Sequence, residues 1–552
     1  MKIRIAFFVY GLALLLGLSG PLQAQTTTAS DPNDALYSDL QTWHDRGYTG
    51  YLSPLRPYPL QVIRRALQRV VARGDAESVR EAQRYLKIYG SNGSYRTGVL
   101  AEGATDKSDY YARAGLAGWM DTWFSNYVTG SARLDVFGLK GTSTSNPFLE
   151  PAGQTYPVDV TSDNAYVGSV TIRPTFLGDF AVGTPDFYAH GGVQRADYGP
   201  FWTNGVFLGA QAPEDANYAV SWHNGLFNAD FDYQSIPVTD SLGNQVRTAP
   251  NKQLYLHSYG IRPTDWFDFR FIETVTTNKS DLFYAVPLSS FFINNLLAGD
   301  GDKSKEGVTL EFTLPQQLRL NLAANLDDAD FNSLVQGNFN TKLKIGVQTG
   351  LSWTPMNSWL QRVNLDYTAV TPFTYTHESF APPGSLGYPN NFNQPNYLVY
   401  TGANGVNLGP DLLPNSDRIQ LVARFQPLYG WHFAFLGRFI RHGDANAGTP
   451  SQGWTAALNQ PSSLEGGLYD PGLGTQTSYQ FVSSNPFLSQ SVLELVLVLQ
   501  LQARYVLDFG HGFSLTAVPN YAFQQTWNKN LVEGQSETLN TFGLSVAATM
   551  SY

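Results

Sequence analysis

Acidic and aromatic residues gather in the second half of the chain, where they could hold a polar ligand. Three aspartates stand close together at the end of an alternating segment, and tyrosines and a histidine follow in a stretch rich in Asn and Pro. Aromatic rings stack against the C–H faces of sugars, and carboxylates and amides form hydrogen bonds with sugar hydroxyls. This composition predicts a glycan contact; the alternative is a set of solvated or packed loop residues. The candidates are Asp327, Asp328, Asp330, Tyr375, His377, Tyr397 and Tyr400.

The sequence holds no motif of a known catalytic site. It lacks a Gly-x-Ser-x-Gly elbow, a His-Glu-x-x-His pair and a phosphate-binding loop, and it contains no cysteine. Asp300-Gly301-Asp302 resembles the start of a calcium loop, but Gly301 and the following Lys303-Ser304-Lys305 interrupt the ligand spacing. The eight histidines form no metal-ligand pair at helical spacing. We therefore expect no enzyme activity, no metal site and no cofactor.

A second set of charged residues recurs within segments that alternate between apolar and polar positions. Full charges need water or opposite charges, so these residues are predicted to face a wet interior. They could pair into a lattice that plugs this interior, or they could line an open channel, and the sequence leaves both possibilities open. The predicted interior charges are Glu311, Arg319, Lys342, Lys344, Arg362, Asp366, Arg424 and Arg438.

The elements that must carry these residues are β-strands with a two-residue period. Residues 541–552 alternate without interruption between an apolar and a small or polar set, and similar segments recur from about Ser108 onward. A closed transmembrane barrel explains both faces, because lipid meets the apolar side and backbone groups in lipid must pair internally. A soluble all-β fold is the alternative. We count eighteen candidate strands, among them 122–138, 166–173, 176–183 and 204–211.

The connections between these strands are short at one end and long at the other. The short set includes 262–266, 314–318 and 354–359, whereas 371–417 and 441–490 are long and polar. This asymmetry is typical of outer-membrane barrels. Aromatic residues beside the short turns indicate an interfacial girdle; they are Trp266, Trp353, Trp359, Trp431 and Tyr552.

The N-terminal part has a different organisation. Residues 1–24 have the charge, apolar core and small-residue end of a cleavable signal peptide, and residues 25–33 are polar and predicted to be disordered. Three short amphipathic patterns that end at glycines predict a three-helix segment with a linker over residues 34–107. The barrel is then predicted to span residues 108–552. After residue 24, no stretch is apolar enough for a transmembrane helix.

This order of pieces resembles the Wzi-type capsule-assembly family of outer-membrane barrels. Residues 39–60 (DLQTWHDRGYTGYLSPLRPYPL) are similar to that family's opening helix, its corner and its proline-preceded second helix. The hairpin of residues 256–275 resembles one in the family that carries a later glutamate, here Glu273. Further similar strings cover 198–213, 325–331 and 400–421. The resemblance covers most of the chain, although its longest loops differ from those of typical members.

The resemblance implies a lectin-like role, in which polysaccharide is retained at the outer surface and the helices lie near the periplasmic mouth. We therefore predict a non-enzymatic outer-membrane barrel that binds or anchors capsular polysaccharide or exopolysaccharide. A porin-like diffusion channel for small solutes is the alternative. The predicted partners are outer-membrane lipid and lipopolysaccharide, a surface polysaccharide, and the barrel-assembly machinery, which would recognise the C-terminal strand ending at Tyr552. A net charge of −10 argues against nucleic acid.

Overall fold

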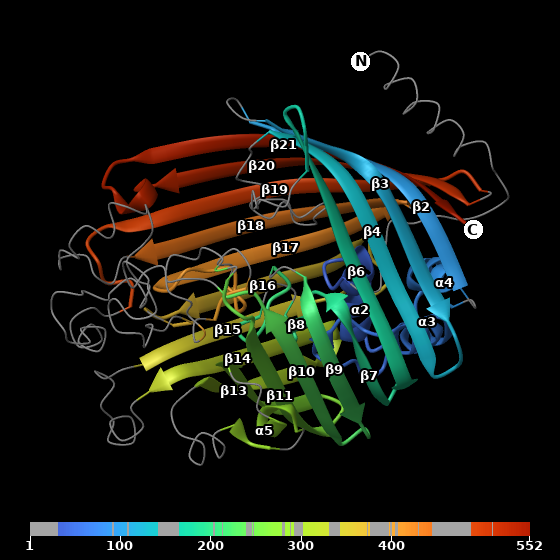
Figure 1. The fold of residues 1–552 in the computed structure, drawn as a ribbon, viewed down its shortest axis with the longest axis horizontal. Coiled ribbons are helices and arrows are strands. Elements are labelled where there is room, and N and C mark those ends of the chain that lie inside the picture. Colours follow the sequence, from blue (N-terminus) through green and yellow to red (C-terminus); the bar gives the residue numbers. More distant parts are fainter. Residues whose placement is uncertain are drawn as a thin grey trace.

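The protein is a closed antiparallel barrel whose interior holds an N-terminal helical segment (Figure 1). The structure is a computed structural model. It describes residues 31–90, 93–106, 110–141, 165–201, 205–211, 214–238, 246, 248–278, 282–286, 289–291, 302–329, 343–372, 374–375, 397, 400–402, 407–428, 430–443, 487–510 and 512–552. The predicted signal peptide and disordered N-terminus lie outside these residues, apart from residues 31–33.

Eighteen strands form the barrel wall in the described part of the chain, as the alternation predicted. They are β2 (Gly93–Thr105), β3 (Tyr110–Trp123), β4 (Val128–Gly141), β6 (Val170–Thr184), β7 (Phe187–Gln194), β9 (Asp215–His223), β10 (Phe227–Ile236), β11 (Lys252–Thr264), β12 (Phe267–Thr277), β13 (Asp302–Leu314), β14 (Leu318–Ala329), β15 (Leu343–Trp353), β16 (Leu360–Val370), β17 (Ser416–Leu428), β18 (Trp431–Gly443), β19 (Leu493–Asp508), β20 (Phe513–Trp527) and β21 (Ser536–Ser551). The barrel closes where β21 pairs with β2, from Arg96 opposite Ser551 to Thr105 opposite Phe542.

Smaller elements complete the described structure. A two-stranded sheet of β1 (Leu55–Arg56) and β8 (Asp197–Tyr198) lies apart from the wall, and β5 (Ala165–Val167) pairs only with the start of β6. The helices are α2 (Ala35–Asp45), α3 (Leu60–Arg73), α4 (Ala76–Tyr89) and the short α5 (Leu282–Ala285). The 3₁₀ turns are η1 (Pro315–Gln317) and η7 (Lys529–Leu531). No helix in the described ranges is long and apolar enough to cross a membrane.

The strand faces follow the predicted alternation. On β21, Phe542 and Leu544 are exposed on the outer face, whereas Ser545 and Thr549 are buried on the inner face. Large apolar side chains such as Phe176, Phe180 and Leu501 are likewise exposed around the outside. This is the surface that an acyl-chain environment would cover.

The predicted number of strands is right, but only because two strands counted in excess offset two strands that were missed. The end of segment 166–173 and the whole of 176–183 form the single strand β6, which continues through Pro174 where β6 pairs only with β4; residues 166–167 belong to β5. Residues 204–211 are not a wall strand: the described part of this segment turns into the lumen. The segment 122–138 contains the end of β3 and most of β4.

The two strands that the prediction missed are β2 and β7. β2 lies inside residues 34–107, which we had assigned to helices and linker, so the wall begins before Ser108. Its outer positions include Thr97, Ala101 and Gly103, and β7 contains the pair Gly191-Gly192. Small residues make the apolar alternation too weak to see, although the backbone pairs normally.

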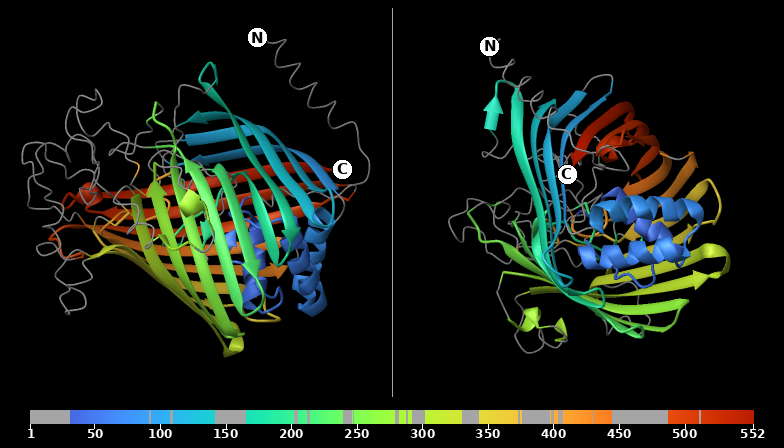
Figure 2. Two further views of the ribbon diagram at one scale, coloured as in Figure 1. Left: turned by 60° about the horizontal axis from the view of Figure 1, so that its bottom comes forward. Right: turned by 90° about the vertical axis from the view of Figure 1, so that its right-hand side faces the viewer.

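Helices α2, α3 and α4 lie across the short-turn end of the barrel (Figure 2). Asp34 accepts a hydrogen bond from the Leu36 N–H and Asp75 accepts one from the Ser78 N–H, so that each aspartate caps a helix. The predicted apolar stripes are buried in a common core with Trp43, Tyr85 and Tyr89. Hydrogen bonds tie this core to the wall: the Trp123 indole donates to the Tyr89 carbonyl oxygen at 3.0 Å.

We predict that filling the space at the closing seam destabilises the barrel. A Cβ atom on Gly98 of β2 would lie 2.8 Å from Thr549 Cγ2 and 3.0 Å from the Ala548 carbonyl oxygen. Gly98→Val should therefore lower stability by about 1–3 kcal/mol through overpacking. The measurement is the temperature at which the folded band disappears on a semi-native SDS gel.

Gly118→Val on the neighbouring strand is the matched control, because a Cβ there meets no atom within 4 Å. Valine also suits a strand, so this variant should melt with the wild type. Equal losses in the two variants would contradict the seam explanation.

Candidate functional site

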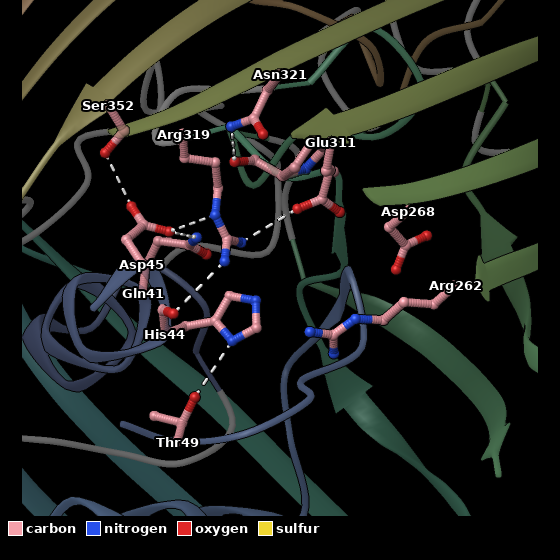
Figure 3. A network of polar contacts seen from close by, with 12 residues as sticks. Gln41, His44, Asp45, Thr49, Arg262, Asp268, Glu311, Arg319, Asn321 and Ser352 are labelled. Atoms are coloured by element: carbon pink, nitrogen blue, oxygen red, sulfur yellow. Dashed lines mark hydrogen bonds and ion pairs between the residues drawn. The ribbon is translucent and has the colours of Figure 1, made fainter. Parts of the chain in front are cut away.

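An ion-pair network fixes helix α2 to the inner wall (Figure 3). Asp45, at the C-terminal end of α2, lies 3.4 Å from the Arg319 guanidinium and 3.3 Å from that of Arg362. The Ser352 hydroxyl donates to the same carboxylate at 2.8 Å. Arg319 also pairs with Glu311 at 3.2 Å. We call these residues, with Arg270 and Asp268 beyond Glu311, the anchor network.

A second set of ion pairs lies further from the helices. Asp411 pairs with Arg418 of β17 and, at 3.3 Å, with Arg438 of β18. Arg438 also donates to the Gln420 side-chain oxygen at 2.7 Å. Asp411 belongs to the connection between β16 and β17, so this connection is held against the lumen wall. Three of the predicted interior charges thus pair with segments that enter the barrel; they are Arg319, Arg362 and Arg438.

Residues 195–201 and 205–211, which we call the inner segment, fold from the connection between β7 and β9 into the lumen. β8 within it pairs with β1, and Arg56 forms an ion pair with Asp197 at 2.5 Å. The Asn321 amide donates to the Pro200 carbonyl oxygen at 3.0 Å. The inner segment thus joins the helical segment to the wall from inside the barrel.

An apolar cluster surrounds the inner segment. Its buried side chains come from this segment, from β1, from six wall strands and from the connection between β16 and β17. They include Tyr198, Phe201, Val206, Phe207 and Leu208. Burial of these large apolar groups stabilises the inner segment in the lumen, by about 1.5–3 kcal/mol for each fully buried large side chain.

Three of the predicted glycan-contact residues come together in a buried cluster that contacts the inner segment. The Asp327 carboxylate accepts from the Tyr375 backbone N–H at 2.7 Å, and the Tyr375 hydroxyl donates to the Val206 carbonyl oxygen at 2.6 Å. The Tyr400 ring stacks on Tyr375 with centroids 5.7 Å apart, and its hydroxyl donates to the Phe207 carbonyl oxygen. We call Asp327, Tyr375 and Tyr400 the clasp.

The clasp residues are 4%, 2% and 0% exposed in that order, so their ring faces and carboxylate are not open to a ligand in this conformation. The Lys305 ammonium completes the group, 3.5 Å from the Tyr400 ring centroid and 4.0 Å from Asp327. This arrangement is the loop packing that we gave as the alternative to direct glycan contact.

The remaining predicted residues are dispersed. Asp328 pairs in register with Lys344, and Tyr397 is half-buried. Asp366 and Lys344 are buried on the inner wall, and Arg424 lines a pocket described below. Three predicted residues lie outside the described part of the chain: Asp330, His377 and Lys342.

Sequence reasoning missed the partners of the predicted charges. Three of these partners lie outside the predicted strand segments whose charges we had placed in the interior; they are Asp45, Asp411 and Lys305. A fourth, Arg270, had not been singled out as an interior charge. The signal available for Asp45 was its position just before the glycine that ends a helical pattern. That position does not reveal which strands it faces, because the contact joins residues about 270 to 320 positions apart in the chain.

A pocket with about 640 Å³ of atom-free space, part of it open to solvent, remains between the helices and the wall of β16–β19. Asp39 and Glu81 line it from α2 and α4. Arg424, His432 and Arg504 line it from the inner wall close to the short turns. It is therefore an opening with charged groups on both sides, at the short-turn end of the lumen.

The two aspartates of α2 have opposite electrostatic environments. Burial raises the pKa of Asp39 to about 6, and the nearby Glu81 adds to the effect, while Arg504, Arg424 and the Tyr85 hydroxyl reduce it. Burial acts in the same direction on Asp45, but the charges of Arg362 and Arg319 outweigh it, so the pKa of Asp45 is lowered. Asp45 is therefore held as an anion, and ionised Asp39 is poorly compensated.

Comparison with known proteins supports the fold. No family model matches the sequence, and no curated protein matches it. The structure is similar to Wzi of Escherichia coli, an outer-membrane protein involved in group 1 capsule assembly and described as a carbohydrate-binding β-barrel. The TM-score is 0.53 at 12% identity, over 96% of this chain and 99% of that chain. The predicted resemblance to Wzi-type barrels is confirmed for the fold.

Two structures from Pseudomonas aeruginosa are also similar. OccD3 has a TM-score of 0.40 at 11% identity, over 84% of this chain and 91% of that chain. OprD has a TM-score of 0.41 at 11% identity, over 83% of this chain and 95% of that chain.

We predict that Asp45→Asn destabilises the protein at neutral pH. The variant leaves two buried arginines without their shared carboxylate, which should cost about 3–5 kcal/mol. Because the pKa of Asp45 is lowered by folding, its contribution is present above the unfolded pKa of about 4 and is lost as pH falls further. Thermal unfolding in detergent between pH 3 and 8 should show the two melting curves converge at the acid end. A constant difference over this range would contradict the ion-pair explanation.

We predict the opposite sign for Asp39→Asn on the same helix. Since folding raises the pKa of Asp39 to about 6, the wild type should lose stability as pH rises from about 4 to above 6. The amide cannot ionise, and its oxygen can still accept from Tyr85, so the variant should melt higher than the wild type at pH 8 and equally near pH 4. A variant that melts lower at pH 8 would refute this assignment.

Proposed function

We propose that this protein is an outer-membrane barrel that binds or anchors a capsular polysaccharide or exopolysaccharide at the cell surface, without enzymatic activity. The observation that carries the proposal is the filled lumen. Helix α2 and the described part of the connection that carries Asp411 are fixed in the interior by ion pairs, and the described part of the inner segment is held there by apolar contacts. Such an interior serves as a rigid support for the loops above it. The similar fold of Wzi, described as carbohydrate-binding, agrees with this role.

The same filling disfavours the alternative of a diffusion channel. A solute would have to displace the apolar cluster around Phe201 and Phe207 and separate the buried ion pairs of the anchor network. Open channels of this strand number keep a water-filled lumen. In planar bilayers the purified protein should therefore give no steady ion-conducting openings, and such openings would favour the channel.

In this proposal the clasp positions the loops and does not touch the glycan. Asp327, Tyr375 and Tyr400 fix the first and last parts of the β16–β17 connection to the inner segment. The residues proposed to contact sugar are then the other candidates at this end, Asp328, Asp330, His377 and Tyr397. Their aromatic, amide-rich surroundings in the sequence supply the chemistry.

The remaining parts of the proposal concern export and membrane contacts. Residues 1–24 would direct secretion, and the apolar outer face would meet lipid and lipopolysaccharide. The terminal strand would be recognised by the assembly machinery through its aromatic end. At that end, the Tyr552 backbone N–H donates to the Tyr95 carbonyl oxygen at 2.7 Å.

Deleting the gene should release polysaccharide from the cell surface, and the wild-type gene should restore it. We predict that Asp327→Ala restores it several-fold less well, because the variant loses both the acceptor of the Tyr375 backbone N–H and the carboxylate that lies 4.0 Å from the Lys305 ammonium. Cell-attached polysaccharide is measured after washing, together with the amount of folded barrel in the membrane.

Asp508→Ala is the matched control, because this aspartate bonds to Gly510 at a short turn at the opposite end of the barrel. It should restore polysaccharide fully. Normal attachment in the deletion strain would refute the proposed function, and normal attachment with Asp327→Ala would refute the role of the clasp.

A further inference from the structure

Two glutamines on the inner face of β19 are buried without hydrogen-bond partners. Gln500 and Gln502 are 0% and 4% exposed, and among the described residues neither the nitrogen nor the oxygen of either amide has a hydrogen-bond partner. Asn520 of β20 lies directly opposite Gln502, and its buried side-chain oxygen is also unpaired. We call these three residues the amide wall. A buried unpaired amide costs free energy, so three on one surface indicate groups that would bond to them when bound.

The amide wall leads into the pocket at the short-turn end. Gln502 lines this pocket, and so does His432, whose Nε2 is buried and unpaired. In the sheet register, Gln502 lies opposite Ala434 and His432 lies opposite Arg504, so the polar groups form one continuous surface. Unpaired donors and acceptors thus face a space that is already open.

The charges around the pocket select against strongly charged ligands. Three carboxylates, those of Asp39, Glu77 and Glu81, line the helical side, and Arg424 and Arg504 line the wall. An anion would approach the three carboxylates, and a cation would approach the two arginines, so neither gains freely. A neutral molecule with many hydroxyl groups can donate hydrogen bonds to carboxylates and accept them from arginines at the same time. Its hydroxyls can also donate hydrogen bonds to amide oxygens and accept them from amide nitrogens.

An aromatic side chain completes this chemistry. Trp43 of α2 lines the pocket. Ring edges pack well against the C–H groups of a sugar. We propose that this pocket binds a neutral saccharide of one or two units, which enters from the short-turn end and bonds to Gln502 and the amide wall.

This inference does not rest on the proposed function, because the pocket lies at the opposite end of the barrel from the clasp and the long loops. The two ideas can therefore fail separately. Polysaccharide attachment tests the long-loop end, and binding of small saccharides to the purified protein tests the pocket.

The test uses the full-length barrel in detergent, titrated calorimetrically with glucose and maltose, and with glucuronic acid and glucosamine as charged analogues. Saturable binding of at least one neutral sugar is expected, with weaker binding of both charged analogues. Gln502→Leu should weaken neutral-sugar binding roughly tenfold or more, since it removes both amide partners. It should not lower the melting temperature, because the amide has no partner to lose.

Gln194→Leu is the matched control. Gln194 is equally buried on the wall strand β7, but its amide donates to the Asn217 side-chain oxygen at 2.7 Å. This variant should melt at a lower temperature and bind sugar as the wild type does. Absence of heat with every neutral sugar would mean ordered water only and would overturn the proposal. Unchanged binding by Gln502→Leu, or tighter binding of a charged analogue, would also overturn it.

Discussion

The dominant constraint on this structure is that a backbone exposed to lipid must pair all its polar groups within the protein. A closed sheet meets this requirement, and eighteen strands pairing from β2 round to β21 meet it here. A barrel of this number of strands is too wide for its own wall side chains to fill. Closure therefore creates a second requirement, because the interior must either stay wet or be filled by other parts of the chain. This protein fills much of it with the helical segment, the inner segment and the β16–β17 connection.

The polar inner face determines how this filling is attached. Along each wall strand, residues that face lipid alternate with residues that face inward, and the inward set includes charged groups. When buried, these charges are stable only when they are paired. Asp45 serves this purpose for Arg319 and Arg362, and Asp411 does so for Arg418 and Arg438. Apolar contacts hold the inner segment in the same way that they hold a soluble core. The interior thus combines a buried ionic lattice with a small conventional core.

Periodic features of this architecture could be predicted from the sequence, whereas long-range partners could not. The fold class, most of the wall strands and the three helices follow from alternation and from helical stripes such as that of Leu60, Ile63 and Leu67. β2 and β7 were not predicted, because small residues such as Gly103 and Gly191 weaken the two-residue alternation of hydrophobicity in these strands. Residues 204–211 read as a strand because Val206, Phe207 and Leu208 are apolar, and only the structure shows that they point into a core inside the barrel. Tyr375 and Tyr400 were singled out from the sequence as glycan-contact candidates. Their burial could not be predicted, because it depends on segments more than 160 residues away.

The seam between β2 and β21 also sets an order of events. These strands are joined by the longest loop closure in the wall, and their register unites residues more than 430 positions apart. The entropy cost of bringing these two strands together is therefore the largest of any ladder in the wall, and the β2–β21 ladder is expected to form after the others. Once it has formed, the wall has no unpaired strand edge at this position, and the helical and inner segments are surrounded by a continuous sheet.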